Sequence, residues 1–165
     1  MRRSSSQGEL FPSPAPAGPR RAFDAQAYAK GLDPEHEALQ PLGIGSETFK
    51  AFACGYSASG INRGRLALPL TDSQGNVLGY VGRALTEEQQ PKLVIPNGVE
   101  VEGVIFGKIE QGIGELYLMR DVLDVLRAHE GGLQAVCVLT EGLSALQLQV
   151  LAALMDEMKI ERLEF

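Results

Sequence analysis

The sequence predicts an α/β protein with an α+β lead-in, in which a small helical and antiparallel β subdomain precedes a parallel β-α-β-α-β unit. Residues 65–85 alternate in hydrophobicity on both sides of a turn-forming run, which is typical of an antiparallel hairpin. From residue 114 onward, strand-like and helix-like stretches alternate, which predicts parallel strands with right-handed crossovers. A chain of 165 residues with 44% apolar residues is long enough for one hydrophobic core.

Three parts are predicted along the chain. Residues 1–22 are rich in serine, proline and arginine and have almost no apolar periodicity, so we expect a disordered tail. Residues 23–113 form the helical and antiparallel β subdomain. Residues 114–165 form the parallel unit, and we expect both subdomains to pack together as one folded unit.

Capping residues predict the helices of the lead-in. Asp24 precedes a helix over 25–30, and Asp33, followed by proline, marks a second helix start. Gly43 ends that second helix. Ser46 is predicted to cap a third short helix.

Turn residues and periodicity predict the remaining elements. Asp72 begins the turn of the hairpin, and two short strands follow within KLVIP and GVIF. In the C-terminal part, Asp121 caps a helix that ends at a glycine pair, and Ser144 begins a capping box for a helix running to about residue 158. We expect the strands of this part at residues 116–119, 136–139 and RLEF.

Composition excludes several classes of protein. No apolar run approaches the length that spans a bilayer, so we expect no membrane partner and a cytoplasmic location. The net charge of −6 argues against a generic binder of the nucleic-acid backbone, although a local basic patch stays open. Cys54 and Cys137 lie in apolar stretches and predict buried free thiols, and the few Cys and His residues do not predict a zinc site.

Several motifs in a fixed order resemble the catalytic core of bacterial primases. LGIGSETFKAFACGYSASGINRGRLALPLTDSQGNVLGYVGRAL is similar to the segment before the Toprim fold: Gly-Ile, a short helix, Gly-Tyr, a strand ending in Pro-Leu, Asp-x-x-Gly and Gly-Tyr-x-Gly-Arg. Pro91-Lys92 and Phe106-Gly107 resemble two further elements. The resemblance covers roughly residues 35–165, and it implies that residues 114–165 are a truncated, Toprim-like first half.

The resemblance also shows where this chain departs from the family. In the family, a glutamate at the end of the first Toprim strand and a later Asp-x-Asp bind divalent metal for phosphoryl transfer. Arg120 stands at the glutamate, Asp121 at the following glycine, and Asp124 is kept, while Phe165 is reached where the Asp-x-Asp strand finishes. A two-metal site needs carboxylates to offset the charge of the ions. We therefore expect no catalytic residues, no metal and no cofactor, the magnesium site being lost.

A second alignment is open. VCVLTEGLSALQL also resembles the Toprim signature, with Glu141 as the catalytic glutamate and Ser144 in place of an aspartate. Neither alignment completes an active site. Arg120 and Asp124, four residues apart, predict an ion pair as the simplest role for both.

By this resemblance, three basic residues match positions that line the template groove of primases, namely Arg65, Arg83 and Lys92, and Arg63 is close by in the sequence. They predict contacts with the phosphates of single-stranded nucleic acid. A structural interpretation stays equally open, in which Arg83 anchors a loop through carbonyl groups and Arg65 and Lys92 are ordinary strand-edge charges.

Two hypotheses of function follow. The first is a catalytically inactive primase/Toprim-like protein, a DNA-associated accessory or regulator in replication or mobile-element maintenance, with single-stranded DNA and a primase or replication protein from another gene as partners. The alternative is a protein-interaction module that keeps the fold without binding nucleic acid. A homodimer through the C-terminal strand or the last helix is predicted in either case, because the strand is an edge and the helix is apolar over much of its circumference.

Overall fold

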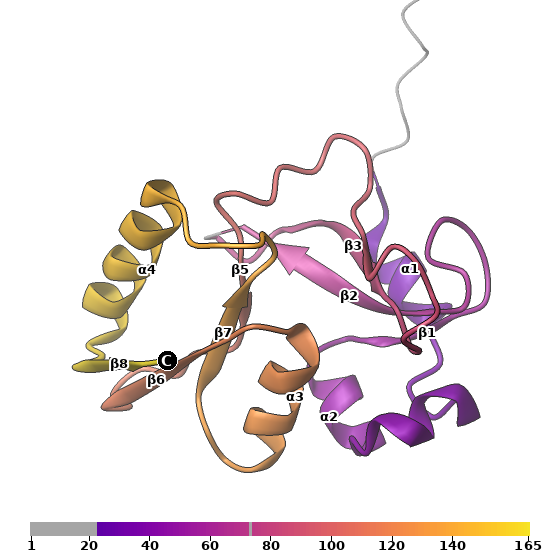
Figure 1. The fold of residues 1–165 in the computed structure, drawn as a ribbon, viewed down its shortest axis with the longest axis horizontal. Helices are drawn as coiled ribbons and strands as arrows, with labels where there is room; N and C mark the ends of the chain where they lie inside the picture. Colours follow the sequence, from indigo (N-terminus) through magenta and orange to yellow (C-terminus); the bar gives the residue numbers. More distant parts are fainter. Residues whose placement is uncertain (1–22, 73) are drawn as a thin grey trace, which may run out of the picture.

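The computed structural model describes residues 23–72 and 74–165. Within this part of the chain, three short helices come first, six strands follow, and helices and strands alternate only from residue 115 onward. The predicted disordered tail, residues 1–22, lies outside the described residues. Figure 1 shows two sheets next to each other with helices packed around them. The α/β fold class predicted from the sequence is confirmed.

The first sheet is antiparallel throughout, with its four strands in chain order: β1 (Gly55–Ser57), β2 (Arg65–Thr71), β3 (Val77–Arg83) and β4 (Leu93–Val94). Strands β2 and β3 are the predicted hairpin, in which Leu66 lies opposite Arg83 and Leu68 opposite Val81. The carboxylate of Asp72 accepts hydrogen bonds from backbone N–H groups within the connecting turn. The hairpin and its turn are therefore confirmed.

The second sheet has the spatial order β5-β7-β6-β8. Its strands are β5 (Ile105–Gly107), β6 (Glu115–Met119), β7 (Ala135–Val138) and β8 (Arg162–Glu164). Strand β6 pairs in parallel with β7 and β8, as predicted, whereas β5 pairs with β7 in the antiparallel direction. Because β5 belongs to this sheet, the sheets divide before Ile105, while the subdomain boundary at residue 113 stays a prediction.

Three of the predicted N-caps are confirmed. The helices are α1 (Ala25–Lys30), the 3₁₀ helix η2 (Glu37–Leu42), α2 (Ser46–Ala51), α3 (Val122–Glu130) and α4 (Ala145–Met158). The side chains of Asp24, Asp121 and Ser144 each accept a hydrogen bond from a backbone N–H in the first turn of α1, α3 and α4. The Gln147 side chain in turn accepts from the Ser144 N–H, which completes the capping box.

Two other helix starts were predicted wrongly. Ser46 is the first residue of α2, and the N-cap position is Gly45, whose N–H donates to Oε1 of Glu130 at 2.9 Å. The helix after Asp33 begins only at Glu37, because the N–H of Ala38 is satisfied by the Nδ1 of His36. In the first case the N-cap residue Gly45 has no side chain that could cap the helix, and its own N–H donates to a distant helix, which no neighbouring residue indicates.

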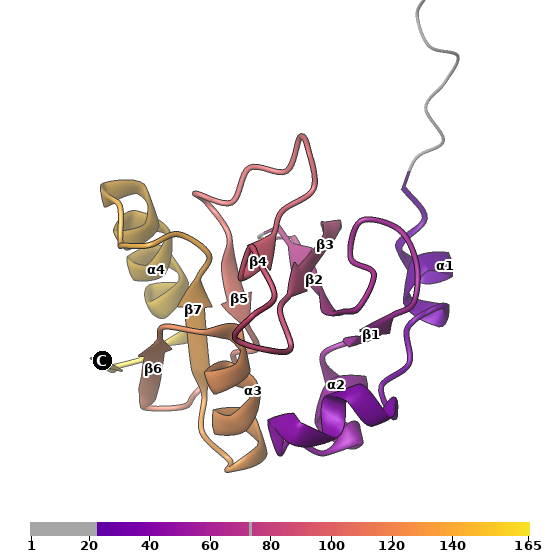
Figure 2. The same cartoon turned by 45° about the vertical axis from the view of Figure 1, so that its right-hand side comes forward.

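The second sheet is covered on both faces, as successive residues of β7 show. Ala135 and Cys137 belong to the main core, which includes side chains of α2, α3 and the first sheet. Val136 points the other way and packs with Leu116 and Leu151 in a smaller cluster beneath α4. Figure 2 shows α3 and α4 on opposite sides of β7. The ends of β6 and β7 are thus fixed between two cores.

The edge next to β8 is open within the described residues. Strand β8 pairs only with β6, and Phe165 after it is 87% exposed. A homodimer through this edge stays a prediction. No helix of the described residues has the length and apolar character needed to cross a membrane.

Candidate nucleic-acid interface

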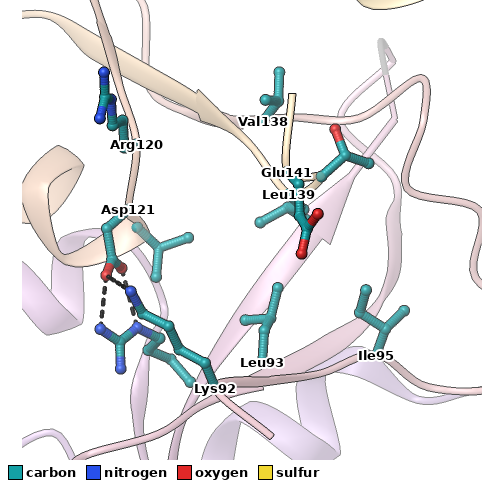
Figure 3. A pocket seen from close by; sticks show the side chains of 11 residues that line it. Lys92, Leu93, Ile95, Arg120, Asp121, Val138, Leu139 and Glu141 are labelled. Carbon is teal, nitrogen blue, oxygen red and sulfur yellow. Dashed lines mark hydrogen bonds and ion pairs between the residues drawn. The ribbon is translucent and has the colours of Figure 1, made fainter. Parts of the chain in front are cut away.

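An open cleft of about 400 Å³ lies where β6 and β7 end. Because both strands run in the same direction, the segments that follow them meet at one edge of the sheet. We call this cleft the basic cleft, and its charged lining side chains are Arg83, Lys92, Arg120, Asp121 and Glu141. Figure 3 shows how Lys92, Arg120, Asp121 and Glu141 lie around it. Three cations therefore face two carboxylates, in a chain whose net charge is −6.

A partly buried ion pair forms one wall of the basic cleft. Arg83 donates Nε to Oδ1 of Asp121 at 3.0 Å and lies with Nη2 2.6 Å from Oδ2, so the contact is bidentate. The two side chains are only 14% and 17% exposed. Lys92 places its Nζ 3.3 Å from the same carboxylate but is 69% exposed. Asp121 thus has two cationic partners before any ligand arrives.

These partners lower the pKa of Asp121. Burial by itself would raise the pKa of the carboxyl group. The hydrogen bonds from Arg83 and from the Leu123 N–H, the charge of Arg83 and the contact with Lys92 outweigh burial and lower the pKa to about 2. Asp121 is therefore ionised at neutral pH, and its charge is already compensated.

Arg120 is exposed, and its guanidinium points away from the Asp121 cluster (Figure 3). The predicted ion pair between Arg120 and Asp124 is wrong, because Asp124 pairs with Arg127 at 3.2 Å. Within residues 23–72 and 74–165, Arg120 makes no ion pair. Glu141 lines the same cleft from the end of β7. The two alternative alignments therefore place their glutamate positions on opposite walls of one cleft.

The four predicted nucleic-acid-binding residues differ in their surroundings. Arg65 is only 6% exposed and donates Nη1 to the carbonyl oxygen of Pro91, so its interpretation as a strand-edge charge is wrong. Arg83 donates Nη1 to the carbonyl oxygen of the adjacent Ala84 and forms an ion pair with Asp121, while its expected role as a loop anchor stays a prediction. Arg63 and Lys92 are exposed. Only these two present free surface to a phosphate.

The hydrogen bond from Arg65 also joins two loops. A second bond, from Nε2 of Gln89 to the carbonyl oxygen of Gly64 at 3.1 Å, fastens the same pair of segments. The loop that carries Arg63 is thereby held against the segment that carries Lys92. No short pattern indicates this link, because the bonded residues lie 25 and 26 positions apart in the sequence.

The donor set of the basic cleft does not fit a magnesium ion. Its carboxylates are Asp121, which already holds two cations, and Glu141, while Arg120 stands where the resemblance places the metal-binding glutamate. Magnesium needs several oxygen ligands and is repelled by adjacent cations. Across residues 23–72 and 74–165, no three His, Cys, Asp or Glu side chains lie close enough together to hold a metal ion.

The fold is that of part of a bacterial primase core, as comparison with solved structures shows. The RNA polymerase domain of Mycobacterium tuberculosis primase DnaG in complex with double-stranded DNA superposes with a TM-score of 0.66 at 20% identity, covering 84% of this chain and 59% of that one. A DnaG primase catalytic domain bound to single-stranded DNA gives 0.65 at 16% identity, with 84% and 57% covered. The E. coli primase catalytic core gives 0.60 at 18% identity, with 78% and 56% covered.

The primase resemblance is therefore confirmed at the level of the fold. The chain spans less than three fifths of the length of each of these three structures. A scan against protein-family models finds no match, and neither does a search of curated proteins.

Proposed function

We propose that this chain binds single-stranded DNA through the exposed cations of its basic cleft and the neighbouring Arg63 loop, without metal-dependent catalysis. It would serve as an accessory or regulatory protein in replication or mobile-element maintenance, beside a primase or replication protein from another gene. We place it in the cytoplasm, in keeping with the two buried free cysteines. The observation that carries the proposal is the set of cations at the end of β6 and β7.

The arrangement of charge supports an anionic ligand. Asp121 is neutralised by Arg83 and Lys92, and Arg120 adds a further cation to the same cleft, without an ion-pair partner among the described residues. A nucleic acid is attracted to such a site, because each phosphate that pairs with a lysine or arginine releases the salt ion that was bound to it. DNA accompanies the primase domains in two of the structures with the same fold.

The proposed contact surface runs from Arg63 past Lys92 to Arg120. The hydrogen bonds between the Arg63 loop and the segment before Lys92 keep the first two cations on one face. Exposed Glu87 and Glu88 lie on that segment and oppose binding. We therefore expect a weak affinity, with a Kd of about 10⁻⁵ M at low salt that rises steeply with ionic strength.

Fluorescence anisotropy with a labelled oligothymidylate tests this proposal across a salt series, with and without magnesium. Replacing Arg63, Lys92 and Arg120 by alanine should weaken binding at low salt by at least about tenfold and reduce the salt slope by about 2, since each lost phosphate contact removes about 0.7. A control variant with Lys30, Lys50 and Arg162 replaced removes the same charge elsewhere on the surface. If both variants lose affinity equally, the effect is one of net charge and the proposed surface is wrong.

Catalysis is tested separately with purified protein. We expect neither primer synthesis nor DNA cleavage when magnesium and nucleotides are added. An activity that is lost on replacing Asp124 or Glu141 would contradict the proposal, because it would show that a carboxylate site works despite Arg120.

A protein-interaction module without nucleic-acid binding is the second candidate. The observation in its favour is α4, where Leu146 and Leu148 are 47% and 49% exposed. Absence of DNA binding at low salt would favour this candidate over the first.

A further inference from the structure

Two adjoining hollows run along α4 on the side of the molecule away from α3. They have volumes of about 600 and 900 Å³ and share the lining residues Asp72, Gly103 and Val150. One wall is α4, and the other is formed by the loop of residues 98–104 and the start of the hairpin turn. We call this combined depression the α4 groove.

The floor and walls of the α4 groove are apolar. Leu146 and Val150 of α4 face Val99 and Val101 across the wider part, and Leu154 lines the narrower part. Leu78, in strand β3 of the hairpin, also lines the wider part and is 42% exposed. Burying exposed leucine and valine side chains yields about 25 cal/mol per Å² of apolar surface, so a partner gains free energy here.

The rim of the α4 groove is acidic. Its lining residues include the carboxylates Asp72, Glu100, Glu102 and Glu157 and contain no lysine or arginine. Hydrogen bonds from Asn76 and neighbouring backbone N–H groups lower the pKa of Asp72, so this group is ionised at neutral pH. The groove therefore presents an apolar channel within a field of negative charge, the reverse of the basic cleft.

We propose that the α4 groove binds a basic amphipathic segment of a partner protein, with apolar side chains in the channel and Lys or Arg beside the acidic rim. Complementary charge selects the partner, and the apolar channel supplies the affinity. This interaction is independent of DNA binding in the basic cleft, so either proposal can fail without the other.

Two labelled model peptides of about 18 residues test the proposal with the full chain. Both carry leucine on one helical face, and they differ in having lysine or glutamate on the other. We expect the lysine peptide to bind with a Kd of about 10 μM and the glutamate peptide at least tenfold more weakly, because its charges meet those of the rim.

A matched pair of variants locates the binding. Ala153 and Ala152 are both exposed on α4, but only Ala153 lines the groove. Ala153→Arg should weaken binding of the lysine peptide at least tenfold by filling and charging the channel, whereas Ala152→Arg should leave it unchanged. A thermal melt by circular dichroism checks that both variants remain folded.

A second pair tests the rim. The variant Glu102→Gln/Glu157→Gln removes two groove carboxylates, and Asp156→Asn/Glu161→Gln removes two exposed carboxylates that do not line the groove. We expect the first pair to weaken the lysine peptide threefold to tenfold and to reduce its salt dependence, and the second pair to have no effect.

Four results would overturn the proposal. These are no binding of the lysine peptide, equal binding of both peptides, no effect of Ala153→Arg, or equal effects of the two carboxylate pairs. Two further outcomes would assign the groove to another occupant. A dimer in sedimentation that Ala153→Arg dissociates would indicate a second copy, and a cross-link from a photoreactive residue at position 153 to residues 1–22 would indicate the chain's own N-terminal segment.

Discussion

The basic cleft and the α4 groove hold their carboxylates in opposite ways. In the cleft, the Asp121 carboxylate forms a bidentate ion pair with Arg83 and a further ion pair with Lys92. In the groove, Glu102 and Glu157 stand beside apolar side chains with no cation among the lining residues. The difference separates a charge that stabilises the fold from charges that are free to act on a partner.

The largest expected effect on the free energy of unfolding concerns the apolar side chains beneath α4. Leu151 is 2% exposed and packs beneath α4 against Leu116 and Val136. Leu151→Ala should lower the free energy of unfolding by about 3 kcal/mol, through lost burial and the cavity left behind. Leu148→Ala, on the exposed side of the same helix, should change it by less than about 0.5 kcal/mol. Urea denaturation measures both, and equal losses would show that α4 is not held by this cluster.

The ion pair of the basic cleft carries the next effect. Asp121→Asn keeps an N-capping side chain for α3 but leaves Arg83 without its counter-charge. We expect the free energy of unfolding at neutral pH to fall by about 2 kcal/mol, as the lowered pKa of Asp121 implies. The control Asp124→Asn, in a half-exposed ion pair, should change it by less than about 0.5 kcal/mol.

The stabilising effect of Asp121 should depend on pH, and the same variant tests this. Because the pKa of Asp121 is lower in the folded chain than the unperturbed value of about 4, its stabilising contribution is complete above about pH 4 and is lost as the pH falls toward 2. The difference in stability between the wild type and Asp121→Asn should therefore shrink over this range. A difference that stays constant from pH 7 to pH 2 would contradict the assigned pKa.

A smaller effect tests the link between the two regions. Gln147 is fully buried in α4, caps the helix through Ser144 and donates Nε2 to Oγ1 of Thr140 in the wall of the basic cleft. Gln147→Ala should lower the free energy of unfolding by about 1 kcal/mol, for the lost capping box and hydrogen bond. Gln149→Ala, which is exposed on the same helix, is the control. If Gln147→Ala lowers only the stability and leaves the affinities for DNA and for the lysine peptide unchanged, the basic cleft and the α4 groove bind their ligands independently.

Local patterns were enough to predict much of the fold. The N-caps Asp24, Asp121 and Ser144 lie within three residues of the N–H groups that they satisfy, so the sequence contains the whole interaction. The hairpin followed from its period of two and its turn residues, and the parallel strands from their alternation with helices. These features depend on neighbours along the chain.

The candidate site was predicted in part. Arg83, Lys92, Arg120, Asp121 and Glu141 were all singled out from the sequence, but as separate residues under competing alignments. The strand predicted within GVIF was found as β5, but its antiparallel pairing with β7 was missed, as was the hydrogen bond from Gly45 to Glu130. The interpretation of Arg65 and the pair of Arg120 with Asp124 were wrong. Each of these depends on a contact between distant parts of the chain.

The sequence by itself determined most of the helices and strands, three of the helix caps, that the C-terminal strands are parallel, and that the chain resembles a primase core. Only the tertiary structure decided that Arg83 meets Asp121 across 38 residues, that Arg65 is buried, and that the carboxylates of the α4 groove gather around an apolar channel. The physical reason is range. Capping and periodicity act over a few residues, whereas burial and ion pairing are set by which segments pack together, and no short pattern specifies that choice.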